Sequence, residues 1–568
     1  MTYEGFHLKI TTDSHGIVPI LAYLSLQPYI MSISRYEPIT FVDEMKELNN
    51  NEIDIDKRRR LNDRVKYIIT AGQTIKSEIY ERGLNGTGQV ICVADTGVDT
   101  NHCLFFDPLN DVIYGNTNPN TKHRKVILYT GYADTTERMY NNHGTHVSGT
   151  AVGYTDGDQF KYNGVAYGAK LSMFDIEDSH GNLLIPNNLQ EYYQLEYTLG
   201  VRILSNSWGK KESNIYTEDT ASTDEYIYNH PDMVIIFAAA NSGASGPGHI
   251  STLAIGKNTI SVGSTYNSGE VITEANAFNY VLPSSSYGNT LDNRIKPDIY
   301  TVGSLRSATT SMATPAIAGA IAIIRQYLME GYYPEGIPSS SSSLSPSASL
   351  LKAMIIHSAV PLKGKATTYT VSPAVISFNK TPNSMGGWGR AQLDRVLFLA
   401  NYTPFNLFLE DQIVGRENGT ILYTLDIDPS YDLRVTLTWT DPPASSLSTN
   451  NLINDLDLYI IIQNNTLYSN SLPYFDRNNN IETISIFAND LNKYINNNSN
   501  HVNITIYVKA FMLSTSSQSY SIVLTGRFEN GFQHYTEQTE ILDFSYSSTL
   551  FSSILLILLS FAFILFSF

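Results

Sequence analysis

Short, uninterrupted runs of apolar residues recur through the first half of the sequence, and they constrain the fold more than any other feature. Each run is about as long as one strand; they cover residues 90–94, 170–174, 201–205, 234–239 and 259–262. Such a run is typical of a strand buried on both faces of a parallel sheet. Helix-like stretches, such as residues 189–199, lie between the runs. The sequence therefore predicts a parallel α/β sheet flanked by helices, whose ligands bind at the carboxyl ends of the strands.

A different pattern begins near residue 400. Short runs of alternating apolar and polar residues cover 421–425, 433–439, 456–462, 502–510 and 520–526, which predicts an antiparallel, jelly-roll-like β-sandwich. A chain of 568 residues is also too long for one core. We therefore divide it into an N-terminal segment (1–75), an α/β domain (76–400), a sandwich (401–530), a juxtamembrane linker (531–547) and a terminal helix (548–568). A Ser-rich stretch from Pro338 predicts a surface insertion in the α/β domain.

The last twenty residues, TLFSSILLILLSFAFILFSF, carry no charge over a length that spans a bilayer as a helix. They predict a single-pass transmembrane anchor, although a removable lipid-anchor signal also fits. The apolar stretch at residues 17–26 is short and broken by Pro19, so it does not read as an export signal. Potential N-glycosylation sequons point to an extracellular or luminal catalytic domain, at the cell surface or in the secretory pathway; they lie at Asn85, Asn379, Asn401, Asn418, Asn464, Asn497 and Asn503.

The charge and cysteine content exclude some classes of function. The formal net charge is -17, and no long Lys/Arg-rich stretch is present, so we expect no nucleic-acid partner. Cys92 and Cys103 are too few for a disulfide framework or a Cys-rich zinc site. Cys92 lies in an apolar run and is predicted to be a small buried hydrophobe. A disulfide between Cys92 and Cys103 is the alternative.

Asp95 and His143 are the first candidates for chemistry. Asp95 ends the first apolar run in the sequence ADTG, where a carboxylate must be hydrogen-bonded to be tolerated. Asp-Thr-Gly also marks aspartic proteases, but these need a second such motif, which the sequence lacks. His143 opens HGTHVSGTAVG, whose small residues would let a helix press against its neighbours. His146 lies three residues on without the Glu of a zinc helix, so we expect it to be structural and predict no metal site here.

Ser311 and Asn241 add a nucleophile and a hydrogen-bond donor. Ser311 lies where TTSMATPAIAGAIAIIRQYL begins an apolar helix; a serine there is often only a cap. However, the free N–H groups and the positive dipole of that terminus would also stabilise an oxyanion. Asn241 follows the apolar run IIFAAA, and its side-chain amide could donate a second hydrogen bond to the same oxyanion.

Together these segments resemble the subtilisin-like serine proteases, peptidase family S8, over roughly residues 80–400. The resemblance implies that Asp95, His143 and Ser311 form a catalytic triad, with Asn241 in the oxyanion hole. Ser207-Trp208-Gly209 resembles the family's substrate-binding strand, and residues 296–298 and 386–390 resemble other family segments. The implied function is a serine endopeptidase acting on proteins or peptides. No organic cofactor is implied; structural calcium is frequent in the family, but its ligands cannot be identified from this sequence.

The second half resembles a particular branch, the KP-43-like subtilisins, through TWTDPP from Thr438 and NDLDL from Asn454. By the same resemblance, residues 1–70 would be the remnant of an inhibitory propeptide. The sequence departs from the family pattern in two ways. Thr309 and Ala240 stand where the family usually has glycine, and the loop between Gly303 and Ser311 is shorter than in relatives. These departures keep open a catalytically inactive surface binding or adhesion protein as the alternative. A metal-dependent hydrolase using Asp95 and His143 is a weaker one.

Overall fold

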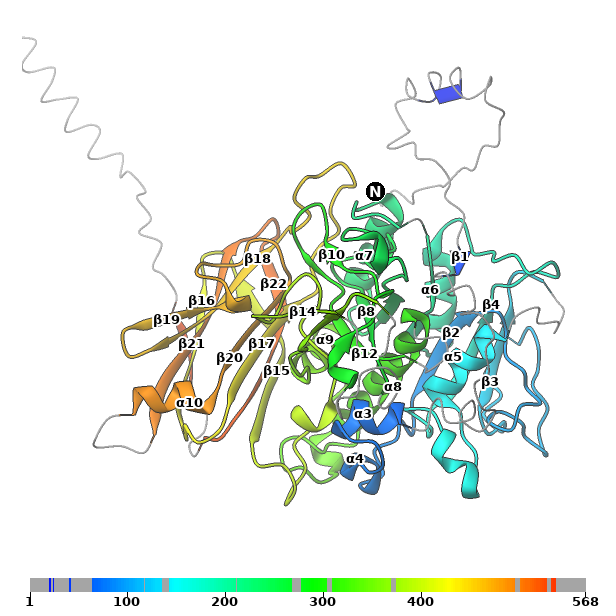
Figure 1. The fold of residues 1–568 in the computed structure, drawn as a ribbon, viewed down its shortest axis with the longest axis horizontal. Coiled ribbons are helices and arrows are strands. Elements are labelled where there is room, and N and C mark those ends of the chain that lie inside the picture. Colours follow the sequence, from blue (N-terminus) through cyan, green and yellow to red (C-terminus); the bar gives the residue numbers. More distant parts are fainter. Residues whose placement is uncertain are drawn as a thin grey trace, which may run out of the picture.

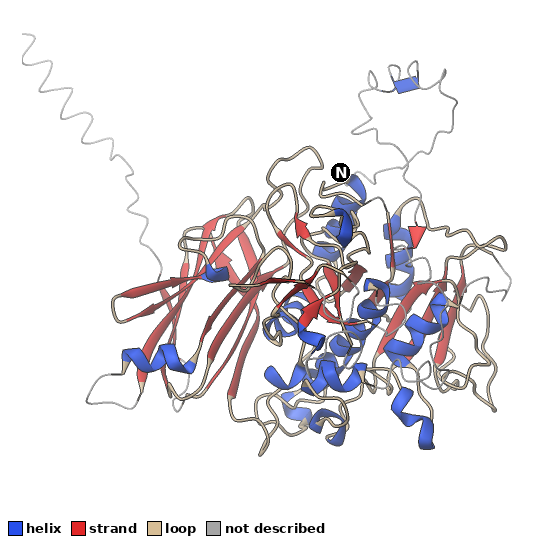
Figure 2. Ribbon diagram, viewed as in Figure 1, coloured by secondary structure: helices blue, strands red, loops and turns tan. Residues whose placement is uncertain are grey.

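The computed structural model describes residues 20–21, 24, 40–41, 64–528 and 533–537, apart from 117, 135–141, 211, 268–276, 304–308, 369–373 and 496–500. The predicted transmembrane segment 548–568, the sequon at Asn497 and most of residues 1–64 lie outside this part of the chain. Two units lie side by side, an α/β unit and a unit built almost wholly of strands (Figures 1 and 2).

The α/β unit is built on the predicted parallel sheet. Its strands are paired in the order β3 (Val126–Gly131), β4 (Lys170–Asp175), β2 (Val90–Asp95), β5 (Ile203–Asn206), β7 (Val234–Ala238), β8 (Ile260–Thr265), with β12 (Ile299–Val302) also on β8. All these pairs are parallel. The sheet continues with β9 (Tyr280–Val281), antiparallel to β8, then β13 (Gly364–Ala366) and β14 (Val375–Ser377). All five apolar runs of the first half are strands, as predicted.

Helices cover both faces of this sheet. Met173 of β4 meets Ser148 of α5 (His143–Val152), whereas its neighbours Ser172 and Phe174 meet α6 (Leu189–Thr198). Because successive side chains of a strand point to opposite faces, α5 and α6 lie on opposite sides. With α5 lies α8 (Thr310–Met329), which also packs on the central strands, and with α6 lies α7 (Glu218–Asn229).

Three further observations bear on the predicted boundaries. The helix α3 (Val65–Ala71) packs into the α/β core through the fully buried Ile68 and Ile69, although it precedes residue 76. Another strand, β23 (Gln533–Glu537), lies in the predicted linker and pairs with the sandwich. Among the described residues, α8 alone is long and apolar enough to cross a membrane, but it is mostly buried as the central helix of the α/β core.

The second unit is an antiparallel sandwich, as predicted. One sheet has the order β15 (Asn406–Arg416), β22 (Ser517–Gly526), β17 (Leu433–Trp439), β20 (Ile481–Ile486). The other has the order β19 (Asn465–Tyr468), β18 (Asp455–Ile462), β21 (Val502–Met512), β16 (Thr420–Ile427), β23. Alternate residues along β16 are buried, so each strand contributes one face to the core between the sheets. That core is formed by the apolar residues of the two inner faces.

The first sheet of the sandwich also packs on the α/β unit. The contact is made by α9 (Ala348–His357), which lies between α8 and the strands β17 and β22. His357 hydrogen-bonds to Thr436 (2.9 Å) and Thr525 (2.8 Å) through its two ring nitrogens. Arg434 donates to the carbonyl of Ile356 (3.1 Å) near the end of α9, where free carbonyls need donors.

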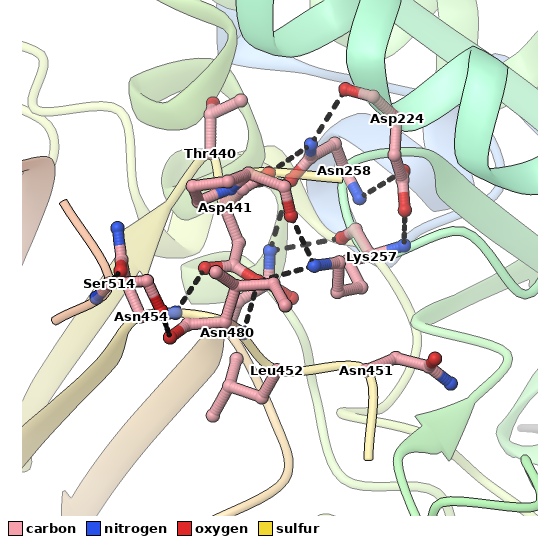
Figure 3. Close-up of polar contacts among 12 residues, drawn as sticks. Asp224, Lys257, Asn258, Thr440, Asp441, Asn451, Leu452, Asn454, Asn480 and Ser514 are labelled. Atoms are coloured by element: carbon pink, nitrogen blue, oxygen red, sulfur yellow. Dashed lines mark hydrogen bonds and ion pairs between the residues drawn. The ribbon is translucent and has the colours of Figure 1, made fainter. Parts of the chain in front are cut away.

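A buried ion pair joins the two units at one edge of this contact (Figure 3). Lys257, before β8, donates to Asp441 of the sandwich at 2.5 Å, and both side chains are fully buried. Asp441 also accepts the backbone N–H of Asn454 (2.8 Å). The TWTDPP and NDLDL segments therefore meet each other and the α/β unit. Asn480 extends the network by donating to the Lys257 carbonyl (3.0 Å).

Candidate active site

Asp95 and His143 form a buried hydrogen-bonded pair. Asp95 is the last residue of β2 and His143 the first of α5, and Asp95 Oδ1 lies 2.7 Å from His143 Nδ1 with both side chains fully buried. The sequence allows this approach because Gly144 has no side chain: a Cβ there would lie 2.1 Å from the carbonyl oxygen of Gly97. The small residues that follow His143 thus do press the helix against the turn after Asp95.

His146 does not join this pair as a second functional imidazole. Burial, together with a smaller effect of the neighbouring His143, lowers its pKa to about 4, so the ring is neutral at physiological pH. Within the described ranges, no three His, Cys, Asp or Glu side chains converge as a metal-ion site. Structural calcium therefore stays an expectation from the resemblance.

Ser311 lies in the first turn of α8 and is fully buried. Its Oγ donates to the carbonyl of Ser207 at 3.3 Å, and Ser207 Oγ donates back to the carbonyl of Ser311 at 2.8 Å. In the described part of the chain, Ser311 makes no hydrogen bond to His143. The structure therefore joins Asp95 to His143, and Ser311 to the predicted substrate strand, but does not close the link between His143 and Ser311.

Asn241 is attached to the beginning of the same helix. Its Oδ1 accepts hydrogen bonds from the backbone N–H (2.9 Å) and the hydroxyl (3.1 Å) of Thr310. These two donors fix the orientation of the amide, so its NH₂ group is the side that can donate to a ligand. The nucleophile and the predicted oxyanion donor are thus held together by the residue between them.

Ser207, Trp208 and Gly209 lie at a strand edge. Trp208 and Gly209 form β6 (Trp208–Gly209), which pairs antiparallel with β1 (Thr40–Phe41) from the N-terminal segment. The strand β1 is labelled in Figure 1. The Trp208 side chain faces inward: it is fully buried, and its Nε1 donates to the carbonyl of Ala94 (3.0 Å). Its backbone therefore offers the pairing edge, whereas its indole fixes that edge to β2.

The two departures from the glycine pattern have different outcomes. Thr309 is the N-cap residue of α8 and makes no capping hydrogen bond through its side chain; its φ of -127° and ψ of 158° are ordinary extended backbone, which does not require glycine. Ala240 instead has φ +102°, where a side chain is strained and glycine is not. The short loop between Gly303 and Thr309 lies outside the described residues.

Sequence reasoning missed the loop of residues 282–286, which follows β9. The N–H of Ser286 donates to the Ala240 carbonyl (3.0 Å), and the Ser286 hydroxyl accepts the N–H of Ser242 (3.0 Å). This loop therefore braces both neighbours of Asn241. Its serines carry no sequence signal, because serine is common in any loop.

Comparison with known proteins adds a family match. The model described as the subtilase family matches residues 86–389. The chain is 28% identical over 546 residues to the serine protease/ABC transporter B family protein tagD of Dictyostelium discoideum, covering 71% of this chain and 30% of that protein. It is 26% identical over 253 residues to subtilisin Savinase of Lederbergia lenta, covering 44% and 80%. The solved structure of sphericase aligns with a TM-score of 0.37 and 21% identity, covering 54% of this chain and 92% of that one. The chain thus spans about a third of the length of the Dictyostelium relative.

Proposed function

The chain belongs to the subtilase family of serine peptidases, and from this premise we propose that it is an endopeptidase with Asp95, His143 and Ser311 as its catalytic triad. The observation that carries the proposal is the buried 2.7 Å hydrogen bond between Asp95 and His143 at the carboxyl end of the parallel sheet. With its Nδ1–H donated to Asp95, the imidazole presents Nε2 as the base, and the carboxylate stabilises the imidazolium that forms.

In the proposed mechanism, the Ser311 side chain turns from the Ser207 carbonyl towards His143 and attacks the substrate carbonyl as His143 takes its proton. The oxyanion accepts hydrogen bonds from the Ser311 N–H, in the first turn of α8, and from the Asn241 amide. His143 then protonates the leaving amine, and water completes the hydrolysis of the acyl-enzyme in the same way.

The substrate is proposed to bind as a strand on β6. The pairing of Thr40 with Gly209 and of Phe41 with Trp208 supports this, because a peptide that adds a strand to a free edge makes the same backbone hydrogen bonds. In the structure the chain's own N-terminal segment holds that edge, so we propose that it is inhibitory until cut. The pairing ends at Trp208, next to Ser207, which is hydrogen-bonded to Ser311.

We also propose that the enzyme is attached to a membrane with its catalytic domain outside the cytosol. The uncharged segment at 548–568 supports an anchor, and the Dictyostelium relatives carry ABC transporter in their names. The exposed positions of Asn401 and Asn418 are compatible with glycosylation.

A serine-reactive fluorophosphonate probe tests the proposal. The full chain is expressed and allowed to cleave off its own N-terminal segment before labelling. We expect covalent labelling of the wild type and none of Ser311→Ala, and we expect sequencing of the self-processed protein to place its new N-terminus just after residue 41 or 42. If the matured wild type hydrolyses no peptide and takes up no probe, the proposal fails. The alternative of an inactive binding protein would then be favoured.

A further inference from the structure

A buried lysine lies beneath the loop that braces Asn241. Lys365 of β13 is 4% exposed, and its Nζ lies within hydrogen-bonding distance of three backbone carbonyls. These belong to Leu282 (2.7 Å), Pro283 (3.0 Å) and Ser285 (3.1 Å). A lysine side chain is rarely buried unless its N–H groups are all satisfied. The three carbonyls accept hydrogen bonds from one group, so Lys365 fixes the path of residues 282–285.

The loop held in this way lies directly against the residues around Asn241. Besides the two hydrogen bonds of Ser286, the N–H of Gly243 donates to the Ser284 carbonyl at 2.7 Å. The contact is close enough that a Cβ on Gly243 would lie 2.1 Å from the carbonyl oxygen of Ser285. A shift of the loop would therefore move the backbone on both sides of Asn241.

Ala240 makes this support necessary. Its φ of +102° is one that residues with side chains rarely adopt, and such a conformation persists only where the surrounding structure imposes it. The hydrogen bond from the Ser286 N–H to the Ala240 carbonyl holds the backbone of Ala240 in this conformation. If the loop relaxed, Ala240 could return to ordinary backbone angles, and the next residue, Asn241, would turn with it.

We propose that Lys365 is a positioning residue for the oxyanion hole: by holding the carbonyls of residues 282, 283 and 285, it keeps Asn241 in place to donate to the oxyanion. The inference rests on the proposed function, because it assigns a role in that reaction. A donor acts on an oxyanion only from a fixed position, and loss of one donor lowers kcat about 10²- to 10³-fold. A donor that is displaced for part of the time should lower kcat less, about 10- to 100-fold.

The test compares Lys365→Met with Lys352→Met in the matured full chain. Lys352 is a matched control: it is 3% exposed, and its Nζ donates to two backbone carbonyls, those of Lys257 (2.6 Å) and Thr259 (3.2 Å). With active sites counted by the fluorophosphonate probe, we expect Lys365→Met to lose about 10- to 100-fold in kcat with little change in KM. Lys352→Met should keep the kcat of the wild type per labelled site, even if its stability falls as much.

Two further variants keep the test decisive. Should Lys365→Met not fold, Lys365→Gln retains a neutral donor and should show an intermediate kcat. Lys365→Ala should regain kcat when propylammonium is added, which a purely structural defect elsewhere would not do. A wild-type kcat in Lys365→Met, or an equal loss in Lys352→Met, overturns the inference. If the wild type itself does not turn over, the proposed function fails instead, so the two failures are distinguishable.

Discussion

Removing the ammonium group of Lys257 should destabilise the whole chain, because it leaves a buried carboxylate without its counter-charge. In Lys257→Met, Asp441 would keep the backbone N–H groups of Ile453 (2.9 Å) and Asn454 (2.8 Å) but lose the cation at 2.5 Å. Both partners are fully buried, so water cannot replace it. Breaking such a pair on one side costs about 3–5 kcal/mol.

The double variant separates the ion pair from the packing. Lys257→Met with Asp441→Asn removes both charges and keeps an acceptor for one of the two N–H groups, because Ile453 and Asn454 donate to different oxygens of Asp441. Its cost should therefore be lower than the sum of the two single costs by about 2 kcal/mol. The exposed pair of Lys493 and Asp490, also 2.5 Å apart, is the control: Lys493→Met should leave the unfolding midpoint unchanged.

Urea unfolding measures these changes, in a Ser311→Ala background that prevents self-digestion. Trp208 and Trp388 report on the α/β unit and Trp439 on the sandwich, so coincident fluorescence and circular-dichroism transitions would show that both units unfold together. A cost below about 1 kcal/mol for Lys257→Met would refute the reasoning. So would additive single costs or two separate transitions, because the interface would then not be a shared core.

Two further substitutions test the strain at Ala240 and the charge buried at Glu196. Ala240→Gly should raise the free energy of unfolding by about 1 kcal/mol, because glycine adopts a φ of +102° without strain; an unchanged or lower melting temperature would contradict this. Burial raises the pKa of Glu196 from 4.5 to about 7, so the native protein keeps a proton that the unfolded chain releases between these pH values. This group alone should therefore lower the free energy of unfolding by about 3 kcal/mol as pH rises through this window. Burial also raises the pKa of Asp175 to about 6 and that of Asp455 to about 7, so the wild type should lose more than this in total. Glu196→Gln should reduce the loss between pH 5 and pH 8, measured by urea unfolding, by most of the Glu196 contribution; an equal loss in both proteins would contradict this.

Local sequence patterns predicted most of the scaffold, because the burial of a strand and the start of a helix depend mainly on residues that are close in the sequence. The apolar run before Asp95 and the glycine after His143 are two examples that the structure confirms. Ala240 departs from the glycine of the family, and its positive φ gives the physical reason for that glycine. Thr309 departs in the same way, but its extended backbone does not require glycine.

Long-range contacts could not be predicted in this way. The pairing of β1 with β6 joins segments more than 160 residues apart, and nothing within either segment identifies the other. Buried lysines are a second case: Lys257, Lys352 and Lys365 would all be placed at the surface from their residue type. Their burial depends on carbonyl groups contributed by distant loops, so only the folded chain reveals it. The direction of the Ser311 hydroxyl likewise depends on Ser207, a hundred residues away.

The energetics of the site favour catalysis over a scaffold that has only kept its shape. Burying the Asp95–His143 pair has a desolvation cost that is not offset by its hydrogen bond. Buried polar pairs can often be replaced by apolar residues without loss of stability. The positive φ of Ala240 does not separate the two alternatives, because glycine at this position would relieve the strain in an enzyme and in a binding protein alike. A binding protein that no longer hydrolysed peptides would gain stability by losing the buried pair, because apolar residues could take its place. The presence of the pair at the carboxyl end of the sheet is expected where function, and not stability, determines the residues.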